Sequence, residues 1–506
     1  MARPSTVAPA PPPPRPRRPG PPAARPRPSL ATLLSVGVPL MAGVALRCWL
    51  MNENSGLTMD SPLYVRMAED LLAGHRAASP AHHGYPALVA LASLVLPGRE
   101  LPGRVVSIVA SLALVAITWW LASRRIGAAL ASVPATLVAL HPLLAVYGSA
   151  VMTEAVFLAL AIGAIALLEG RRAALGGALL GAAWWVRPEA ALLAPIAVLL
   201  APLRARERVL ALALAACVAL PYCVVLRLEQ GYWSLSPKSV LVRAPFADAR
   251  SAEWRLADST AFTDTTSLGA RLTRDGGAIV RAYPSRLLSG LRAALDAWSA
   301  PLLLVSLAGL AFAAGRGAWL AFFILPLVYP LLSAPPDLRF AQLLVPALAL
   351  AAGGALARAR DLGRPWLGVG AALAVGGLVL TWTGPAGRLA LAFDDGPIAA
   401  MRGAGAWLST HSAPDAVVMD RKSYVPFFAR RAHVQLPDET LEVLLRYARD
   451  NRVAYIVLEE YVVRSLRPQL APLLDGAWLA HESRVRLVFA ARPAPGDGVA
   501  VLEVVR

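Results

Sequence analysis

Apolar residues along this chain gather in blocks of 14 to 18 residues, separated by short polar connections. The blocks cover residues 30–46, 105–121, 126–140, 151–168, 173–186, 190–203, 209–226, 298–314, 319–332, 340–356 and 366–383. Apolar runs of this length are typical of helices packed inside a membrane. The pattern therefore predicts an α-helical polytopic membrane protein with about 11 helical segments.

Arginine clusters in the short connections predict the topology. They comprise Arg124 and Arg125, Arg171 and Arg172, Arg204 to Arg208, Arg316, and Arg358 to Arg364. Positively charged connections favour the cytoplasmic side. The clusters before and after 173–203 can share that side only if this segment enters the membrane and returns. Each apolar half spans about 21 Å at about 1.5 Å per residue, less than the roughly 30 Å hydrocarbon core. A helical hairpin is therefore predicted, with Arg187-Pro188-Glu189 at its outward tip.

The remaining segments divide the chain into three domains. Residues 1–28 form a Pro/Arg tail without an acidic residue, predicted to be disordered and cytoplasmic. Residues 29–384 form the transmembrane domain, with outward loops at 51–104 and 227–297. The first loop contains an amphipathic stretch, 64–72, and a short apolar run, 85–96.

Residues 385–506 have a different pattern, in which short β-type runs alternate with helical ones. Strands are predicted at 416–419, 433–436, 454–458, 484–489 and 499–504, and a helix at 438–450. This alternation predicts an extracytoplasmic α/β domain.

Composition supports a membrane protein and excludes a nucleic-acid-binding one. The chain is 57% hydrophobic and 16% charged, with a mean hydropathy of +0.54. Its net charge is +17, but the positive residues lie mainly in the tail and in the short connections between apolar blocks. Positive residues there indicate membrane topology, so we expect a bilayer and no nucleic acid as partner.

Polar residues that the topology brings to the outer face are the candidates for chemistry. They are Asp60, Tyr64, His82, His83, Tyr85, Glu154, Arg187, Glu189, Lys238 and Arg339. Carboxylates beside several cations suit a reaction in which a base deprotonates a hydroxyl while cations hold a departing phosphate. His82 and His83 have no third ligand at a suitable spacing, so no metal site is predicted.

The order of short motifs along this topology resembles the GT-C class of integral-membrane glycosyltransferases. The branch with protein O-mannosyltransferases and lipid A aminoarabinose transferases is the most similar. The matching runs are Asp60-Ser61-Pro62-Leu63-Tyr64, Gly84-Tyr85-Pro86, His141-Pro142 with Thr153-Glu154, Arg187-Pro188-Glu189 and Leu338-Arg339-Phe340. The chain departs from this pattern at Met59-Asp60, where many relatives carry two adjacent acids, and at Phe340, where many carry tyrosine.

The resemblance implies a GT-C fold and inverting sugar transfer from a polyprenyl-phosphate carrier, on the extracytoplasmic side of the cell membrane. The acceptor would be a glycan, a lipid or a protein. Asp60 would align with the first-loop catalytic carboxylate, Glu154 would be a second catalytic candidate, and the other candidates would contact substrate. The resemblance does not decide whether a divalent cation is needed as a cofactor.

Structural roles compete with these functional ones. Asp60 also suits a helix N-cap, and Glu154 a capping pair with nearby hydroxyls. Arg187 and Glu189 would also pair with each other and stabilise the hairpin tip. The side chain of Arg339 would also extend to the lipid headgroups. For the whole protein, the alternative function is a transporter or lipid flippase, in which broken helices are also common.

Overall fold

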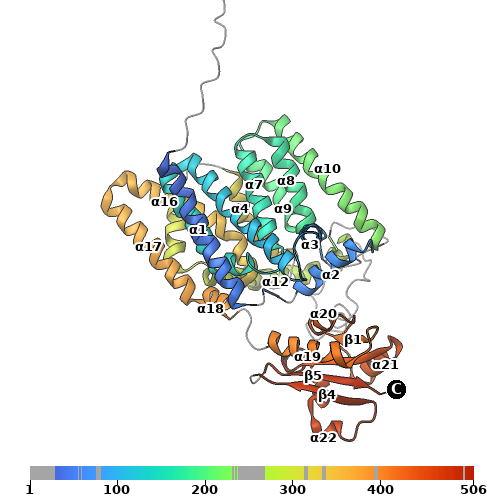
Figure 1. Cartoon of the computed structure of the whole chain (residues 1–506). Coiled ribbons are helices and arrows are strands. Elements are labelled where there is room, and N and C mark those ends of the chain that lie inside the picture. Colours follow the sequence, from blue (N-terminus) through green and yellow to red (C-terminus); the bar gives the residue numbers. More distant parts are fainter. Residues whose placement is uncertain are drawn as a thin grey trace, which may run out of the picture.

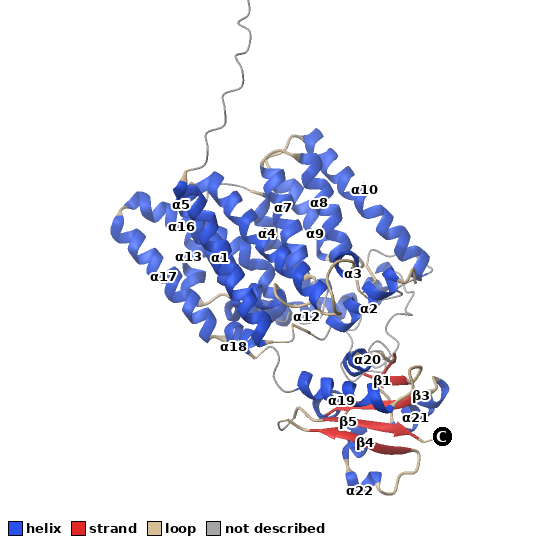
Figure 2. Ribbon diagram, in the orientation of Figure 1, coloured by secondary structure: helices blue, strands red, loops and turns tan. Residues whose placement is uncertain are grey.

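The computed structural model describes residues 29–54, 56–58, 60–75, 81–230, 233, 236–237, 268–312, 317–332, 338–392, 397–493 and 496–505 (Figure 1). A helical part extends from α1 to α18, and all strands lie in a separate C-terminal part (Figure 2). The predicted tail 1–28, Lys238 and much of the predicted loop 227–297 lie outside the described residues.

Each predicted apolar block coincides with helix over most of its length. The corresponding helices are α1 (Leu30–Glu53), α4 (Leu101–Ile126), α5 (Ala128–Leu140), α7 (Glu154–Glu169), α8 (Ala173–Val186), α9 (Glu189–Leu200), α10 (Ala205–Gln230), α13 (Ala300–Phe312), α14 (Ala321–Leu332), α16 (Val345–Leu362) and α17 (Arg364–Thr383). Short turns η3 (Ala318–Leu320), α15 (Leu338–Ala341) and η4 (Gln342–Leu344) precede α14 and α16. Shorter helices α2 (Ser61–Leu72), α3 (Gly84–Ser93), α6 (Pro142–Tyr147) and α18 (Pro385–Leu391) lie between them.

Among the described residues, five helices are long and apolar enough to cross a membrane. A sixth candidate is α12 (Leu268–Ala297) with α13, which meet at an angle of 106°. No helix was predicted within the outward segment 227–297, and α12 fills its last part. Charged residues such as Arg271, Arg274, Asp275 and Arg281 interrupt the apolar stretches of α12, so no membrane-type block stands out there.

The predicted hairpin is formed by α8 and α9, which pack against each other. Pro188 is the N-cap of α9 with a φ of −66°, so the missing amide hydrogen falls where a helix leaves its amides unpaired. At the far end of the hairpin, Arg171 bonds Glu207 at 3.0 Å. The two arginine-rich connections therefore lie at the same end of the helices, opposite Arg187.

Helix α8 also packs very closely on α10, through two glycines four residues apart. A Cβ atom added to Gly177 would lie 2.1 Å from the carbonyl oxygen of Ala211. One added to Gly181 would lie 2.5 Å from the carbonyl oxygen of Ala215. Small residues at this spacing let helix backbones approach closely in membrane proteins. These glycines therefore determine the position of α8, the helix that ends at Arg187.

The C-terminal part is a mixed five-stranded sheet in the order β2-β1-β3-β5-β4. Its elements are α19 (Pro397–His411), β1 (Val417–Asp420), α20 (Tyr424–Ala429), β2 (Ala432–Gln435), α21 (Leu441–Asp450), β3 (Val453–Glu459), α22 (Gly476–Leu479), β4 (Val485–Ala491) and β5 (Val499–Val504). Strands β2, β1 and β3 are parallel, whereas β5 is antiparallel to β3 and β4. Every strand lies within two residues of its predicted position, because short β-type runs are visible in the local sequence.

The C-terminal part lies against the end of the helical part that carries α2 and α3 (Figure 1). Arg66 on α2 donates to the carbonyl of Arg431 at 3.1 Å, and Arg99 donates to the carbonyl of Phe427 at 2.6 Å. Helix α18 packs on α17 and α6, so the helical part extends past the predicted boundary at 384 to Leu391.

Candidate functional site

Five of the predicted site residues form a continuous series of alternating charges. Arg187 bonds Glu189 at 2.6 Å and Glu154 at 2.7 Å. Arg339 bonds the same Glu154 at 2.5 Å and reaches Asp60 at 3.0 Å. We call Glu189, Arg187, Glu154, Arg339 and Asp60 the charge chain. It brings together four segments that are far apart in the sequence, at the hairpin tip.

Helix ends position these side chains. Glu154 is the first residue of α7 and Glu189 the first of α9, where the partial positive charge of a helix N-terminus favours a carboxylate. Arg187 is the C-cap of α8 and Arg339 lies in the short helix α15. Asp60 occupies the N-cap of α2, but its side chain makes no capping hydrogen bond. The carboxylate of Asp60 faces Arg339 instead.

Exposure rises along the charge chain from Glu154 to Asp60. The side chain of Glu154 is 1% exposed, that of Arg339 is 18% exposed and that of Asp60 is 26% exposed. Glu189 and Arg187 are buried at the opposite end. Asp60 and Arg339 are therefore partly accessible from outside the protein, whereas Glu154 is enclosed behind the arginines.

Arg339 has donor capacity left. Its Nε donates to Glu154 and its Nη1 to Asp60, while Nη2 has no hydrogen-bond partner among the described residues. The rings of Tyr147 and Phe340 each lie 5.9 Å from the guanidinium carbon, close enough for cation–π attraction. Phe340 thus flanks Arg339 without the hydroxyl that tyrosine would supply. Tyr147 was not predicted, because it belongs to none of the motifs.

Tyr64 of α2 and Tyr85 of α3 pack against each other. Their rings meet edge to face with centroids 5.4 Å apart, and both side chains are buried. The Tyr85 hydroxyl donates to the carbonyl of Gly103 at 2.9 Å and lies 2.9 Å from Ser107 Oγ. Tyr85 thus packs α3 onto α4 and is fully enclosed in this structure. Tyr64 lies closer to Asp60, on the buried face of α2.

His82 and His83 face different neighbours. His82 Nδ1 donates to the carbonyl of Trp184 at 2.8 Å, and its Nε2 lies 3.0 Å from Ser236 Oγ. His83 Nε2 lies 3.1 Å from Glu229. These contacts connect the start of α3 to α8 and α10. Among the described residues, no group of three His, Cys, Asp or Glu side chains is arranged to hold a metal ion.

Comparison with known proteins identifies the fold. The structure is similar to an oligosaccharyltransferase from Archaeoglobus fulgidus, with a TM-score of 0.61 and 13% identity over 85% of this chain and 70% of that one. It is also similar to ArnT from Cupriavidus metallidurans bound to undecaprenyl phosphate, with a TM-score of 0.55 and 13% identity over 93% and 98% of the two chains. No family model and no curated sequence matches this chain. Both structures are glycosyltransferases of the GT-C class, and this chain has the GT-C fold.

Proposed function

We propose that this protein transfers a sugar from a polyprenyl-phosphate carrier to an acceptor hydroxyl, with Asp60 as the base. The observation that carries the proposal is the ion pair of Asp60 and Arg339, the exposed end of the charge chain. It offers a carboxylate to the incoming hydroxyl and, next to it, a guanidinium to the leaving phosphate. The carrier bound to the similar ArnT structure is of this chemical class.

The reaction would be a single displacement. The acceptor oxygen attacks the anomeric carbon and passes its proton to Asp60, while the bond from that carbon to the carrier phosphate breaks. The phosphate leaves with the electron pair and is held by Arg339 Nη2, the donor without a protein partner among the described residues. Attack opposite the leaving group inverts the anomeric configuration. Oxocarbenium character at the anomeric carbon lowers the barrier.

Within this proposal Glu154 holds other residues in place instead of acting as a second base. It is buried and accepts from Arg187 and Arg339 on the same oxygen. Arg187 in turn is held by Glu189. The hairpin tip thus fixes the orientation of Arg339. His82, His83 and Tyr64 line the substrate site around α2 and α3.

A further cation would favour phosphate binding. The five residues of the charge chain comprise three carboxylates and two guanidinium groups. Lys238 is predicted to lie on the outer face, and we propose it as this cation and as the second phosphate ligand. A divalent cation at Asp60 would serve the same purpose, and adding EDTA to the assay described below tests it.

We also propose that the charge chain faces the extracytoplasmic side, together with the C-terminal domain and the acceptor. The arginine-rich ends near Arg171 and Glu207 then face the cytoplasm, as the positive-inside rule favours. All members of the charge chain lie at one end of the helices, which suits transfer at a surface better than a path through the membrane. Labelling of cysteines introduced at Arg206 and at Asp415 in intact cells tests this orientation: only the second should react with an impermeant reagent.

The decisive experiment assays membranes with a panel of polyprenyl-phosphate sugars and candidate acceptors. Asp60→Asn should lose transfer while keeping the unfolding temperature of the purified protein. Asp361→Asn, which removes a carboxylate at the exposed end of α16, is the matched control and should stay active. Full activity of Asp60→Asn would overturn the assignment of Asp60 as the base. If the wild type transferred no sugar from any of the donors, the proposed transferase function would be overturned.

A further inference from the structure

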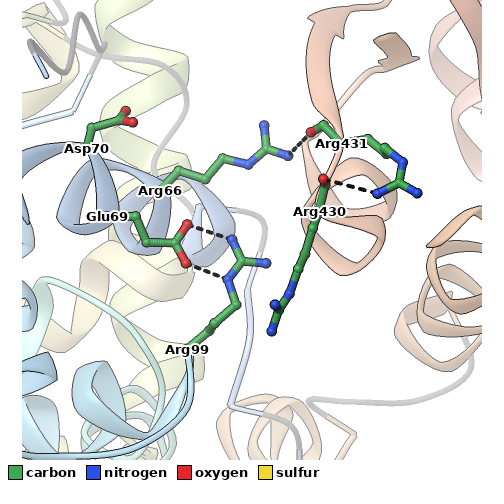
Figure 3. A pocket seen from close by; sticks show the side chains of 6 residues that line it. All are labelled: Arg66, Glu69, Asp70, Arg99, Arg430 and Arg431. Carbon is green, nitrogen blue, oxygen red and sulfur yellow. Dashed lines mark hydrogen bonds and ion pairs between the residues drawn. The ribbon is translucent and has the colours of Figure 1, made fainter. Parts of the chain in front are cut away.

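A second charged site lies between the two parts of the chain, on the outer side of α2. It is a cleft of about 580 Å³. Its walls are formed by Arg66, Glu69, Asp70, Arg99, Arg430 and Arg431 (Figure 3). The first four belong to the helical part and the last two to the turn between α20 and β2. Only the docked arrangement of the two parts creates this cleft.

The arginines of this cleft are only partly neutralised. Arg99 forms a two-bond pair with Glu69, at 2.5 and 2.7 Å. Arg66 donates only to the carbonyl of Arg431, and Arg431 donates only to carbonyls and to a serine hydroxyl. Four guanidinium groups thus face two carboxylates, a formal excess of two positive charges.

Arg430 has no partner for its guanidinium among the described residues. In Figure 3 its side chain extends into the space between the two parts of the chain. Arg430 is also the C-cap of α20, with a left-handed backbone conformation at φ 54° and ψ 46°. Glycine or asparagine usually fills that position, because other side chains crowd the backbone there. The chain therefore places a long cation at a position that disfavours it.

Arg66 shows the electrostatic consequence. Burial and then the neighbouring guanidinium of Arg99 lower the pKa of Arg66 to about 10, although the carboxylates of Glu69, Asp420 and Asp70 act in the opposite direction. The unfavourable electrostatic energy of a partly buried cation beside another cation decreases when an anion binds between them. Arginine clusters of this kind suit phosphate and carboxylate groups, which accept paired hydrogen bonds.

We propose that this cleft binds an anionic group, a phosphate or a carboxylate, carried by the acceptor. Arg66 lies six residues after Asp60 on α2, which is about 9 Å along a helix axis. An acceptor anchored by its anionic group at Arg66 and Arg430 would thus present a hydroxyl to Asp60 from the outer side. This role rests on the proposed transfer reaction, whereas anion binding itself does not.

Anion binding is testable without a known acceptor. The purified full-length protein in a non-ionic detergent is titrated with inorganic phosphate and, separately, with succinate, at constant ionic strength. We expect one of the two anions to raise the unfolding temperature with saturation, and the identity of that anion distinguishes phosphate from carboxylate. No saturable effect of either anion would overturn the proposal.

Two glycine variants separate the site from general effects of charge and strain. Arg430→Gly removes the unpartnered cation and relieves its backbone. Arg452→Gly removes an exposed arginine with the same left-handed backbone (φ 55°), two strands away and outside the cleft. We expect Arg430→Gly to weaken anion binding about tenfold or more, the effect of one charge-assisted hydrogen bond, and Arg452→Gly to leave it unchanged. Equal binding by both variants would overturn the assignment of the site.

The outcome is separable from that of the proposed reaction. If Asp60→Asn loses transfer and Arg430→Gly still binds the anion, only the cleft assignment fails. If Asp60→Asn keeps transfer and Arg430→Gly loses the anion, only the catalytic assignment fails. Once an acceptor is known, Arg430→Gly should raise the KM for that acceptor and leave the KM for the lipid donor unchanged.

Discussion

Arg339 Nη1 lies 3.0 Å from Asp60 Oδ2, although 279 residues separate the two in the chain. The pair joins the start of α2 to the start of the α15–α16 segment and forms the exposed end of the charge chain. A carrier phosphate bound at Nη2 would share this guanidinium with Asp60. In the proposed reaction, Arg339 therefore holds the base and the leaving phosphate next to each other.

Replacing Arg339 by lysine tests whether the guanidinium shape matters. Lysine keeps the charge but is a single point donor, and it cannot bridge Glu154, Asp60 and a phosphate at once. We expect Arg339→Lys to lower kcat on the order of 10²-fold, the loss typical of one donor to a developing oxyanion. Arg360→Lys, at the exposed end of α16, is the control and should match the wild type. Unchanged kcat in Arg339→Lys would mean that charge alone suffices there.

Gly177 is predicted to control the position of Arg187 through helix packing. A methyl group there would meet the backbone of Ala211 at 2.1 Å, so Gly177→Ala must push α8 away from α10. We expect a loss of about 1–3 kcal/mol in stability, measured by thermal unfolding in detergent, together with lower transfer activity. Gly37→Ala in α1 is the control, because nothing lies within 4 Å of its added Cβ atom. If both variants unfold at the same temperature, the close contact does not limit stability.

The stability of the C-terminal domain should depend on Asp420. Burial raises the pKa of Asp420, the last residue of β1, well above its ordinary value, and the nearby carboxylate of Glu459 raises it further. As pH rises from about 4 toward that raised pKa, the unfolded chain releases a proton that the folded domain retains, so stability falls. Asp420→Asn should reduce this fall, and the part that remains comes from Glu459, whose pKa burial also raises.

Hydrogen exchange of the β1 and β3 amides in the full-length protein, followed from pH 4 upward, measures this effect. His433 contributes in the opposite direction, since burial lowers its pKa to about 4, but it is present in both proteins and cancels in the difference. Asp415→Asn, at an exposed position before β1, controls for net charge. Parallel pH profiles of Asp420→Asn and the wild type would contradict the prediction.

Local patterns allowed most elements to be predicted but not the partners of the site residues. The ends of α8 were predicted to the residue, because its apolar run ends abruptly at Arg172 and Arg187. Helix α12 was missed because it is amphipathic and interrupted by charges, so it lacks the uninterrupted apolar run that marks a membrane helix.

The charge chain shows what sequence alone could not decide. Pairing of Arg187 with Glu189 was predictable because both flank one proline. The placement of Glu154 between Arg187 and Arg339 depends on how three separate helices pack, and no local signal encodes it. For the same reason the cleft at Arg66 and Arg430 was not predicted: its two walls come from different domains.

Glu154 provides the sharpest test of the charge chain. Glu154→Gln leaves Arg187 and Arg339 without the buried carboxylate that they share. Glutamine is a weaker acceptor for both arginines, but Glu189 and Asp60 still pair with them, so we expect a loss of about 1–3 kcal/mol in thermal unfolding. Glu169→Gln, at the other end of the same helix, breaks the more exposed pair with Arg125 and should cost at most about 1 kcal/mol.

The double variant Glu154→Gln with Arg187→Gln then tests the role of the second pair. It also removes the guanidinium that bonds the buried Glu189, so it should be less stable than Glu154→Gln. Transfer activity should remain low, because Arg339 would still lack the carboxylate that orients it toward Asp60. Recovery of activity along with stability would show that Glu154 only neutralises Arg187 and does not position Arg339.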